Sequence, residues 1–463
     1  MAWRGESPRG RGCWRMPTHL EGAARGPSSV GASKLVLVTG SSGYIASRLI
    51  PRLLERGTRV RAMAREPGRV NAHPWARSVQ IAAADVLKPE TLPAALEGVH
   101  TAYYLIHNMS LGHGYIASER EGARAFAAAA RQAGVQHIIY LGGLADPNGH
   151  IAAHLRSRIE TGETLRGSGV LVTEFRSGAI VGAGSISFEM IRFISEQFPI
   201  LPGPTWLRNR TQPIAISNIM DYLLAGLEGS PGGVYEIGGP EVMRYAEAMQ
   251  RYARMRGLRR VQLFLPGMPV QLMAWFVDRL TPVPFPIACA LVEGLRADSI
   301  VQDDAALRQF PSVELIPYEK AMSLVLAGTH PDRVERVWDP AAPELSLKHE
   351  GFVIDHCSLR SGLSLAKMWK SLGAPEGFRM EASVPPEWML LKAGQAFGGQ
   401  HWLEWKLHER GDGSQLSLTS FFAGRGLPGH ALWYLKGDQR RAGLRRMLAA
   451  AERKASGAGT RVL

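Results

Sequence analysis

The sequence predicts an α/β protein in which a doubly wound parallel sheet is followed by a smaller α+β domain. Three observations support this prediction. An apolar run at 35–38 ends in a glycine turn and leads into an amphipathic helix. Strand-like and helix-like segments then alternate as far as about residue 175. After residue 331 the pattern changes to successive strands followed by one helix. Alternation of the first kind is typical of a parallel sheet covered by helices on both faces.

The glycine turn is the first element with a functional meaning. After the apolar run the chain reads Thr39-Gly40-Ser41-Ser42-Gly43-Tyr44-Ile45-Ala46. Gly40 permits a tight turn, Gly43 lets the backbone approach a phosphate, and Ala46 allows the helix to pack closely on the strand. Because the N–H groups and the dipole at a helix N-terminus attract anions, this context favours a dinucleotide pyrophosphate site over an ordinary glycine turn.

The alternation continues along the chain. We expect strands at 58–65, 78–83, 100–106, 136–141 and 170–175, and helices at 92–96, 119–133 and 154–165. Since parallel strands are joined by right-handed crossovers, these elements predict a doubly wound Rossmann-type sheet. From 180 to about 326 the pattern is irregular and contains proline-rich apolar pieces at 198–206 and 281–286. Pieces beyond the later strands are where an open α/β sheet carries its substrate crevice.

The C-terminal part has the pattern of a second, antiparallel sheet. Strands are expected at 351–358, 378–384, 389–393, 401–408 and 414–421, with a hairpin turn at Gly411-Asp412-Gly413 and a long helix at 428–453. The length of 463 residues also exceeds one ordinary core. We therefore expect a disordered basic tail at 1–33, a nucleotide-binding domain at 34–330, a C-terminal domain at 331–457 and a tail at 458–463.

The bulk composition is that of a soluble globular protein, with 45% hydrophobic and 21% charged residues. The net charge of +13 suits a nucleic acid, a membrane surface or a phosphorylated ligand. Cys13, Cys289 and Cys357 have no ligand-like spacing, which argues against disulfides and structural zinc and favours the cytoplasm. The basic tail lacks the apolar core of a secretory signal. The longest uncharged stretch, 261–277, contains two prolines and a glycine and is too short to span a membrane.

Several segments resemble the atypical short-chain dehydrogenase/reductases, and more narrowly the bacterial NmrA-like NAD(P)H-binding proteins with a C-terminal domain of unknown function. The segments that carry this resemblance are 39–46, 103–109, 140–144, 154–162, 174–182 and 211–216. The C-terminal part resembles a START-like or SRPBCC helix-grip domain through 401–405, 421–427 and 431–434. The resemblance implies an NAD(P)-binding oxidoreductase fold and adds Leu105, His107 and Gly142 to the expected cofactor-binding residues.

The end of the second strand bears on the choice of cofactor. An acidic residue there would bind the ribose hydroxyls of NAD, whereas this chain has Arg65, with Arg61 earlier in the same strand. A guanidinium suits a 2′-phosphate, so the sequence favours NADP(H) over NAD(H), although both arginines can also be read as solvated charges. Asp85 and Val86 resemble the family's adenine-contacting pair, and Asp85 can equally be a turn or N-cap residue.

The usual catalytic tyrosine and lysine of the superfamily are absent. His154 and Arg158 stand at their places, and Gly142-Gly143 replaces the hydroxyl-bearing pair. Either His154 is a general acid with Arg158 orienting it or binding an anionic group, or the pair is structural. His107 and Asn108, at a strand's carboxyl end, are further candidates. Neither a plausible metal-ligand set nor a nucleophile elbow is found, and Cys357 is read as a core thiol.

The basic helix near the C-terminus allows two interpretations. Its stripe of Trp433, Leu444, Met447 and Leu448 either grips its own sheet, which we favour, or adsorbs weakly to anionic lipid as a peripheral membrane contact. Nucleic-acid binding is not expected, because no recognised reader motif occurs.

Three functions compete. The leading hypothesis is an NADP(H)-dependent oxidoreductase acting on an apolar substrate held near Trp206, Pro213 and 263–288. The runner-up is a nonenzymatic NADP(H)-binding regulator or scaffold. The third is a lipid carrier that uses the C-terminal domain. The sequence names neither the substrate nor the oligomeric state.

Overall fold

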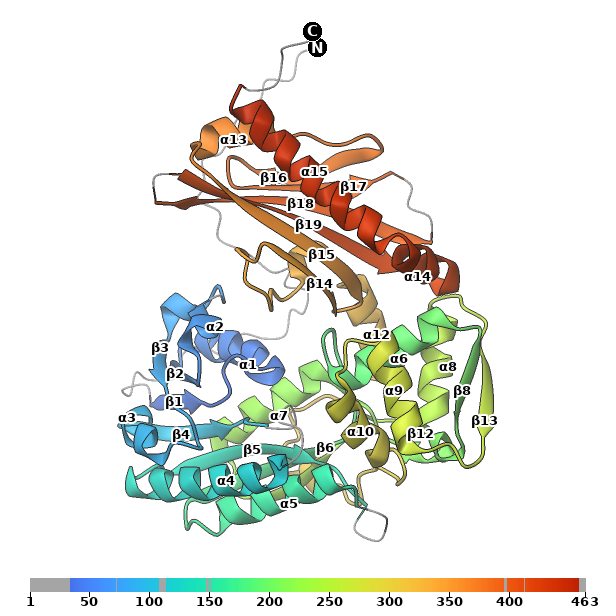
Figure 1. The fold of residues 1–463 in the computed structure, drawn as a ribbon. Helices are drawn as coiled ribbons and strands as arrows, with labels where there is room; N and C mark the ends of the chain where they lie inside the picture. The colour runs from blue at the N-terminus through green and yellow to red at the C-terminus, as the bar shows by residue number, and fades with distance from the viewer. Residues whose placement is uncertain are drawn as a thin grey trace, which may run out of the picture. The chain divides into compact units, whose positions relative to one another are not determined.

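The computed structural model describes residues 34–71, 73–107, 114–146, 149, 151–394, 398–411 and 413–457. Its main sheet has seven strands in the order β11-β6-β5-β4-β1-β2-β3, and all neighbours are parallel (Figure 1). The strands are β1 Leu35–Val38, β2 Arg59–Ala64, β3 Gln80–Ala83, β4 Val99–Tyr104, β5 His137–Gly143, β6 Leu171–Ser177 and β11 Gly233–Ile237. The strand order reverses between β1 and β4, as a doubly wound sheet requires. The predicted fold class of this part is confirmed.

Both faces of this sheet are buried, which explains the unbroken apolar run of β1. Val36 and Val38 join one apolar cluster, and Leu35 and Leu37 join another on the opposite face. Helices α1 Tyr44–Glu55 and α7 Ile216–Gly229 contribute to the first cluster, and α3 Leu92–Leu96, α4 Tyr115–Gln132 and α5 Ala153–Arg166 contribute to the second. Figure 1 shows α4 and α5 together on one side of the sheet.

The segment expected to be irregular, 180–326, is made of short regular elements. Besides α7 and β11, these are, in chain order, β7 Ile180–Val181, α6 Ile186–Gln197, β8 Ile200–Pro204, β9 Arg210–Thr211, β10 Ile214–Ala215, β12 Met243–Arg244, α8 Tyr245–Met255, β13 Val261–Leu265, α9 Val270–Leu280, α10 Phe285–Gly294, α11 Ala305–Gln309 and α12 Tyr318–Ala327. Within the same segment, β11 pairs with β6 and completes the main sheet. β11 was not predicted from the sequence. It has only five residues, the first of which is Gly233, and so short a strand gives little periodic signal.

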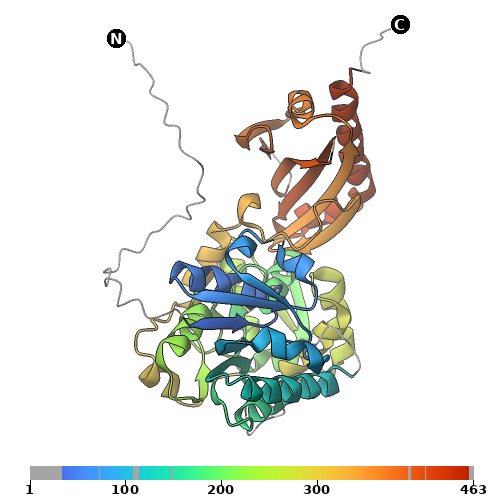
Figure 2. The same cartoon turned by 90° about the vertical axis from the view of Figure 1, so that its left-hand side faces the viewer.

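The C-terminal part forms a six-stranded antiparallel sheet in the order β14-β15-β19-β18-β17-β16. The strands are β14 Glu344–His349, β15 Phe352–Ser361, β16 Phe378–Val384, β17 Trp388–Ala393, β18 Gly399–Arg410 and β19 Gly413–Gly424, and the helices are α13 Leu365–Ser371, α14 Gly426–Leu435 and α15 Gly437–Ala455. Figure 2 shows α15 lying along one face of this sheet. Asp412 of the expected hairpin turn lies outside the described residues.

One expectation for this part was wrong: the helix predicted over 428–453 is two helices, α14 and α15. Trp433 of α14 stacks on Phe422 with ring centroids 3.9 Å apart, and Arg440 of α15 lies over the same Trp433 ring. The break between the two helices, at Lys436, thus lies between Trp433 and the Arg440 that covers its ring. On α15, Leu444 and Leu448 are buried in the apolar cluster of the sheet.

Within the parts of the chain that the structure describes, none of the helices combines the length and the apolar character that crossing a bilayer requires.

Candidate functional site

A cavity of about 340 Å³ lies at the carboxyl ends of β1, β2 and β4, beside the N-terminus of α1. We call it the strand-end hollow. It occurs where the strand order reverses, which is where open α/β sheets bind their ligands. Its lining residues are Gly40, Ser42, Gly43, Tyr44, Ile45, Ala46, Met63, Ala64, Arg65, Ala84, Asp85, Val86, Leu105, Ile106, His107, Leu141 and Arg158.

The glycine turn forms one wall of the hollow. Gly40 has φ +63°, and a Cβ there would lie 3.1 Å from the Leu105 carbonyl oxygen. A Cβ on Gly43 would lie 3.0 Å from the Gly40 carbonyl oxygen. The chain can therefore make this turn only with little or no side chain, and it leaves backbone open to the hollow at the start of a helix. This geometry fits a bound pyrophosphate.

Thr39 and Ser41 support the turn from behind and do not line the hollow. The Thr39 hydroxyl accepts a hydrogen bond of 2.9 Å from the Leu105 N–H, and the Ser41 hydroxyl donates one of 2.7 Å to the Val38 carbonyl. Both side chains are buried. They hold β1, the turn and the end of β4 together.

The two arginines of the second strand have different positions. Arg65 follows β2, is exposed, and lines the hollow. Arg61 does not line it, because its guanidinium donates to the carbonyls of Ala95 at 2.9 Å and Glu97 at 2.7 Å, at the end of α3. Of the two, only Arg65 is placed to meet a ligand in the hollow.

Asp85 makes a local turn and also lines the hollow. One carboxylate oxygen accepts a 3.0 Å hydrogen bond from the Leu87 N–H, which makes a local turn. At the same time Asp85 and the buried Val86 line the hollow.

His107 lines the hollow and is held by Glu119 of α4. The His107 Nδ1 and a Glu119 carboxylate oxygen are 2.7 Å apart, and the Ser157 hydroxyl of α5 donates to the other oxygen. Burial alone would raise the pKa of Glu119, but the hydrogen bonds from His107 and Ser157 and the nearby Arg158 charge lower it to about 2. Because this carboxylate only accepts, His107 donates from Nδ1. Burial and the Arg158 charge lower the pKa of His107.

His154 and Arg158, one turn apart on α5, are not equivalent. Arg158 lines the hollow and donates to the Leu141 carbonyl at 2.7 Å. His154 does not line it and is buried, and its Nδ1 has no hydrogen-bond partner among the described residues. Burial, with the charges of His107 and Arg158, lowers the pKa of His154 to about 4, so this imidazole is neutral at pH 7.

Other residues expected at the site also lie outside the hollow. Gly142 does not line it; a Cβ there would approach the Tyr140 ring and the Glu174 carboxylate. Trp206 packs in the apolar cluster of α6, α9 and α10, Pro213 is buried, and no part of 263–288 lines the hollow. Asn108 falls outside the described residues.

Glu119 and Ser157, which orient His107, were not predicted as site residues from the sequence. Both lie on buried faces of helices, Glu119 beside Ala123 and Phe126 of α4, and Ser157 on α5. A charged or hydroxyl residue at the apolar positions of a helix is the signal that could have revealed them. Among the described residues no group of three or more His, Cys, Asp or Glu side chains is arranged to hold a metal ion.

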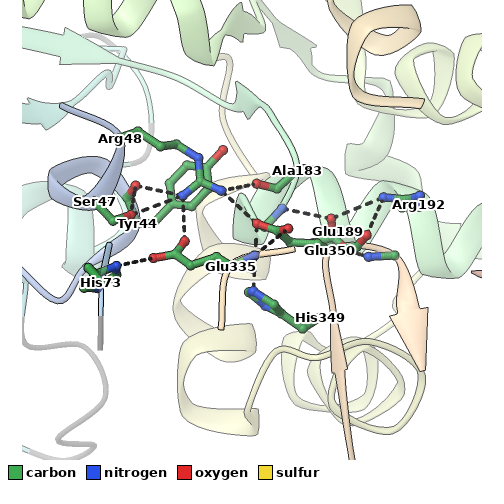
Figure 3. A network of polar contacts seen from close by, with 12 residues as sticks. Tyr44, Ser47, Arg48, His73, Ala183, Glu189, Arg192, Glu335, His349 and Glu350 are labelled. Atoms are coloured by element: carbon green, nitrogen blue, oxygen red, sulfur yellow. Dashed lines mark hydrogen bonds and ion pairs between the residues drawn. The ribbon is translucent and has the colours of Figure 1, made fainter. Parts of the chain in front are cut away.

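Figure 3 shows that the helix beginning at the hollow also binds the C-terminal part of the chain. Tyr44 lines the hollow, and one turn later the Arg48 guanidinium lies 3.9 Å from the centre of its ring. Arg48 pairs with Glu335 at 2.9 Å and with Glu350 at 2.8 Å. Burial raises the pKa of Glu350, and the Arg48 charge opposes that rise. We call these four residues the Arg48 network.

Comparison with known proteins relates this chain to NAD(P)H-binding proteins. A family described as NAD(P)H-binding matches residues 40–169. The chain is 33% identical over 115 residues to a 3-beta-hydroxysteroid dehydrogenase of Mycolicibacterium neoaurum, covering 23% of this chain and 31% of that protein. It is 26% identical over 196 residues to a ceramide reductase of Caulobacter vibrioides, covering 41% of this chain and 59% of that protein. The chain thus spans about a third of the first relative's length and about three fifths of the second's.

Two solved structures share the fold. A triphenylmethane reductase of Citrobacter sp., complexed with NADP(H), matches with a TM-score of 0.51 and 18% identity over 62% of this chain and 99% of that chain. An NADPH-dependent quinone oxidoreductase of Escherichia coli, complexed with NADPH, matches with a TM-score of 0.50 and 16% identity over 63% of this chain and 99% of that chain. The chain therefore contains an NAD(P)H-binding domain with the fold of these reductases.

Proposed function

We propose that this protein is an NADP(H)-dependent oxidoreductase that acts on a carbonyl, or an activated double bond, of an apolar substrate. One observation carries the proposal: a single hollow is lined by the groups this chemistry needs. The glycine turn, Arg65 and His107 all line it, and His107 is oriented by buried Glu119. A bound nicotinamide nucleotide supplies or accepts the hydride.

In this proposal His107, and not His154, moves the proton. Its Nδ1–H is committed to Glu119, which leaves Nε2 for a group in the hollow. In the oxidative direction the neutral imidazole accepts the proton of a substrate hydroxyl. In the reductive direction His107 takes up a proton from solvent at Nε2, and the imidazolium, a stronger acid because its pKa is lowered, donates that proton to the substrate oxygen while the Glu119 carboxylate stabilises the cation. Arg158 and Leu141 both line the hollow, and the hydrogen bond from Arg158 to the Leu141 carbonyl holds the guanidinium in place there.

The preference for NADP(H) rests on Arg65. This side chain is exposed at the hollow, and among the described residues no carboxylate pairs with it. A free guanidinium at this strand end would bind the 2′-phosphate through charge-assisted hydrogen bonds.

The apolar substrate is supported by the lining and by the relatives. Met63, Leu105, Ile106 and Leu141 give the hollow a largely apolar wall. The names of two relatives refer to a hydroxysteroid and a ceramide, both of which are apolar molecules.

Cofactor binding is tested by titrating NADPH and NADH against the wild type, Arg65→Ala and Arg59→Ala. Arg59 is the matched control, because it is exposed on the same strand but does not line the hollow. Loss of a charged hydrogen bond costs about 1.5–3 kcal/mol, so Arg65→Ala should weaken NADPH binding about 10- to 100-fold and change NADH binding little. Equal losses for both nucleotides would argue against a 2′-phosphate contact.

Turnover is tested with apolar aldehydes, ketones and quinones. His107→Asn should slow NADPH oxidation about 100-fold or more while NADPH binding persists, because general acid catalysis contributes that much. His154→Asn should retain activity within about threefold. If His154→Asn instead slowed turnover more than His107→Asn, His154 would be the general acid. Tight NADPH binding without turnover of any compound would favour the regulator over the enzyme.

We also propose that 331–457 form a domain of the START-like, helix-grip type. Support comes from the antiparallel sheet and from α15, which packs on it through Leu444 and Leu448. Limited proteolysis whose first cut falls between the two sheets, at 331–343, would support the boundary; a first cut within β15–β19 would contradict it.

A further inference from the structure

A two-stranded ribbon in the middle of the chain presents its apolar side chains outward. β8 and β13 pair in parallel, with Ile200 opposite Val261 and Pro202 opposite Leu263. Along β13 the exposed positions are apolar: Val261 is 66% exposed, Leu263 48% and Leu265 36%. The side chains between them, Gln262 and Phe264, are the less exposed ones. A strand with one solvated face normally has the opposite arrangement, with its polar residues outside.

The next element along the chain, α9, repeats this feature after a connection of four residues, 266–269. Met273, Ala274 and Val277 are buried in the apolar cluster shared with α6 and α10. On the other side of the helix Leu272 is 45% exposed, Trp275 46% and Phe276 39%. These three positions, i, i+3 and i+4, lie on one helical face. The helix is thus apolar on two sides, and only one of them is covered.

We call the outer faces of the β8–β13 ribbon and of α9 the apolar surface. Single exposed apolar residues need no explanation, but a concentration of them on neighbouring elements marks an interaction site. β8 and α9 (Figure 1) pack on the same buried cluster, to which β8 contributes Leu201 and α9 contributes Met273.

The charges around this surface are mainly positive. Residues 254–285 contain one acidic residue, Asp278, and five arginines. Arg256 pairs with Glu196 and Arg260 donates to backbone carbonyls of α6, whereas Arg254, Arg259 and Arg279 are exposed. Arg259 lies two residues before β13, and the Arg279 guanidinium lies 5.7 Å from the centre of the Trp275 ring. Exposed aromatic side chains beside arginines are typical of a protein face that lies in the headgroup region of a membrane.

We propose that the apolar surface docks this protein on an anionic lipid bilayer. The aromatic and aliphatic side chains enter the boundary between headgroups and acyl chains, while the arginines remain at the phosphates. A second copy of the chain is a less suitable partner for this surface than an anionic bilayer. A twofold interface would place the same arginine-rich patch on both subunits and bring like charges together.

This contact differs from the one that the basic C-terminal helix suggested. The apolar stripe of α15 is used against its own sheet, where Leu444 and Leu448 are buried. The outer face of α9 has no such cover among the described residues. The proposal does not rest on the enzymatic function, because docking requires neither a bound nucleotide nor turnover.

The test is sedimentation of the full-length protein with vesicles of phosphatidylcholine alone or containing 30% phosphatidylglycerol. Wild type should partition at least tenfold more onto the anionic vesicles, and added salt should weaken the binding. The double variant Leu263→Ser/Trp275→Ser should lose tenfold or more of this binding. The double variant Leu307→Ser/Leu324→Ser is the control, because its residues are similarly exposed, at 46% and 51%, but lie on α11 and α12.

NADPH titration of each variant checks that the nucleotide-binding fold is intact. Because it does not depend on vesicle binding, it also tests the proposed function separately from docking. Partition of the Leu263/Trp275 variant equal to that of wild type would overturn the proposal. A dimer in size-exclusion chromatography that the same variant dissociates, together with no vesicle binding by wild type, would also overturn it and assign the surface to a second copy. Binding to anionic vesicles that only this variant loses supports docking, whatever the outcome for turnover.

Discussion

Glu119 occupies a position on α4 where helical spacing predicts an apolar side chain. Glu119, Ala123, Phe126 and Ala130 share the buried face of that helix. The carboxylate is tolerated there because His107 and Ser157 donate to its two oxygens. An arrangement of this kind costs stability when one member is lost, because a buried polar group remains without its partner. The same cost makes the role of Glu119 measurable.

We predict that Glu119→Gln lowers stability in a pH-dependent way. The pKa of Glu119 is lowered to about 2 in the folded protein, from an ordinary value of 4.5. A carboxylate with a lowered pKa contributes stability that is present above pH 4.5 and is lost as the pH falls towards 2. The variant should therefore be less stable than wild type by an amount of order 3 kcal/mol at pH 6. Urea unfolding should show this difference shrinking below pH 4.5.

The control is Glu160→Gln, whose exposed pair with Arg120 should contribute less than about 1 kcal/mol. A difference between wild type and Glu119→Gln that stays constant from pH 6 to pH 3 would contradict the assignment of the lowered pKa to Glu119.

Residue type predicted which groups to consider, but not which of two similar groups faces the hollow. Arg61 and Arg65 lie on or just after one strand, yet Arg61 is used by the carbonyls at the end of α3. His107 and His154 are both near Arg158, yet only His107 lines the hollow. These choices depend on where α3, α4 and α5 pack against the sheet, which is a property of contacts distant in sequence.

At the scale of elements, the long periodic segments were predictable and the short ones were not. The expected strand at 170–175 is β6 and the expected helix at 154–165 is α5, with bounds that differ by one or two residues. β11 and β14 were missed, and the break between α14 and α15 was not expected. Each depends on a partner elsewhere in the chain. β11 pairs with β6 and β14 pairs with β15, and Trp433, just before the break, stacks on Phe422.

The turn between β14 and β15 shows how distant contacts fix a local conformation. His349 pairs with Phe352, so Glu350 and Gly351 form a two-residue hairpin loop. Both have positive φ, +48° and +79°. Glutamate is not a usual residue for such a turn, and the left-handed conformation costs about 1 kcal/mol or more. Its ion pair with Arg48 explains why glutamate stands there.

We predict that Arg48→Met destabilises the protein by about 2–3 kcal/mol, because it leaves Glu350 buried without its cation. The pKa of Glu350, which burial already raises, should rise further. The control is Arg56→Met on the same helix segment, whose pair with Glu228 is exposed and should contribute less than about 1 kcal/mol. Urea denaturation at pH 7 compares the two. Equal effects would show that the Arg48 network contributes no more than a surface pair.

At the scale of the whole molecule, the Arg48 network joins the helix that begins at the strand-end hollow to the β14–β15 hairpin. Arg192 of α6 reinforces the connection by donating to the Glu350 carbonyl at 3.1 Å. Tyr44 takes part in both regions, because it lines the hollow and lies against Arg48. A ligand that orders the start of α1 is therefore expected to stabilise the hairpin as well, since the two share one set of ion pairs.

This coupling gives a prediction that rests on the proposed NADPH binding. At an NADPH concentration of about 100 times its Kd, the folded state gains about 2.7 kcal/mol, and exchange of the β14 and β15 amides should slow in wild type. In Arg48→Met the nucleotide should still bind, because Arg48 does not line the hollow. In that variant NADPH should slow amide exchange less at the hairpin than at β1 and β4, whereas Arg56→Met should behave as wild type.

Hydrogen exchange followed by mass spectrometry measures the hairpin and the β1–β4 region separately. Equal slowing of the hairpin and of β1 in Arg48→Met would show that the connection runs through other contacts, of which the Arg192 hydrogen bond is the next to remove.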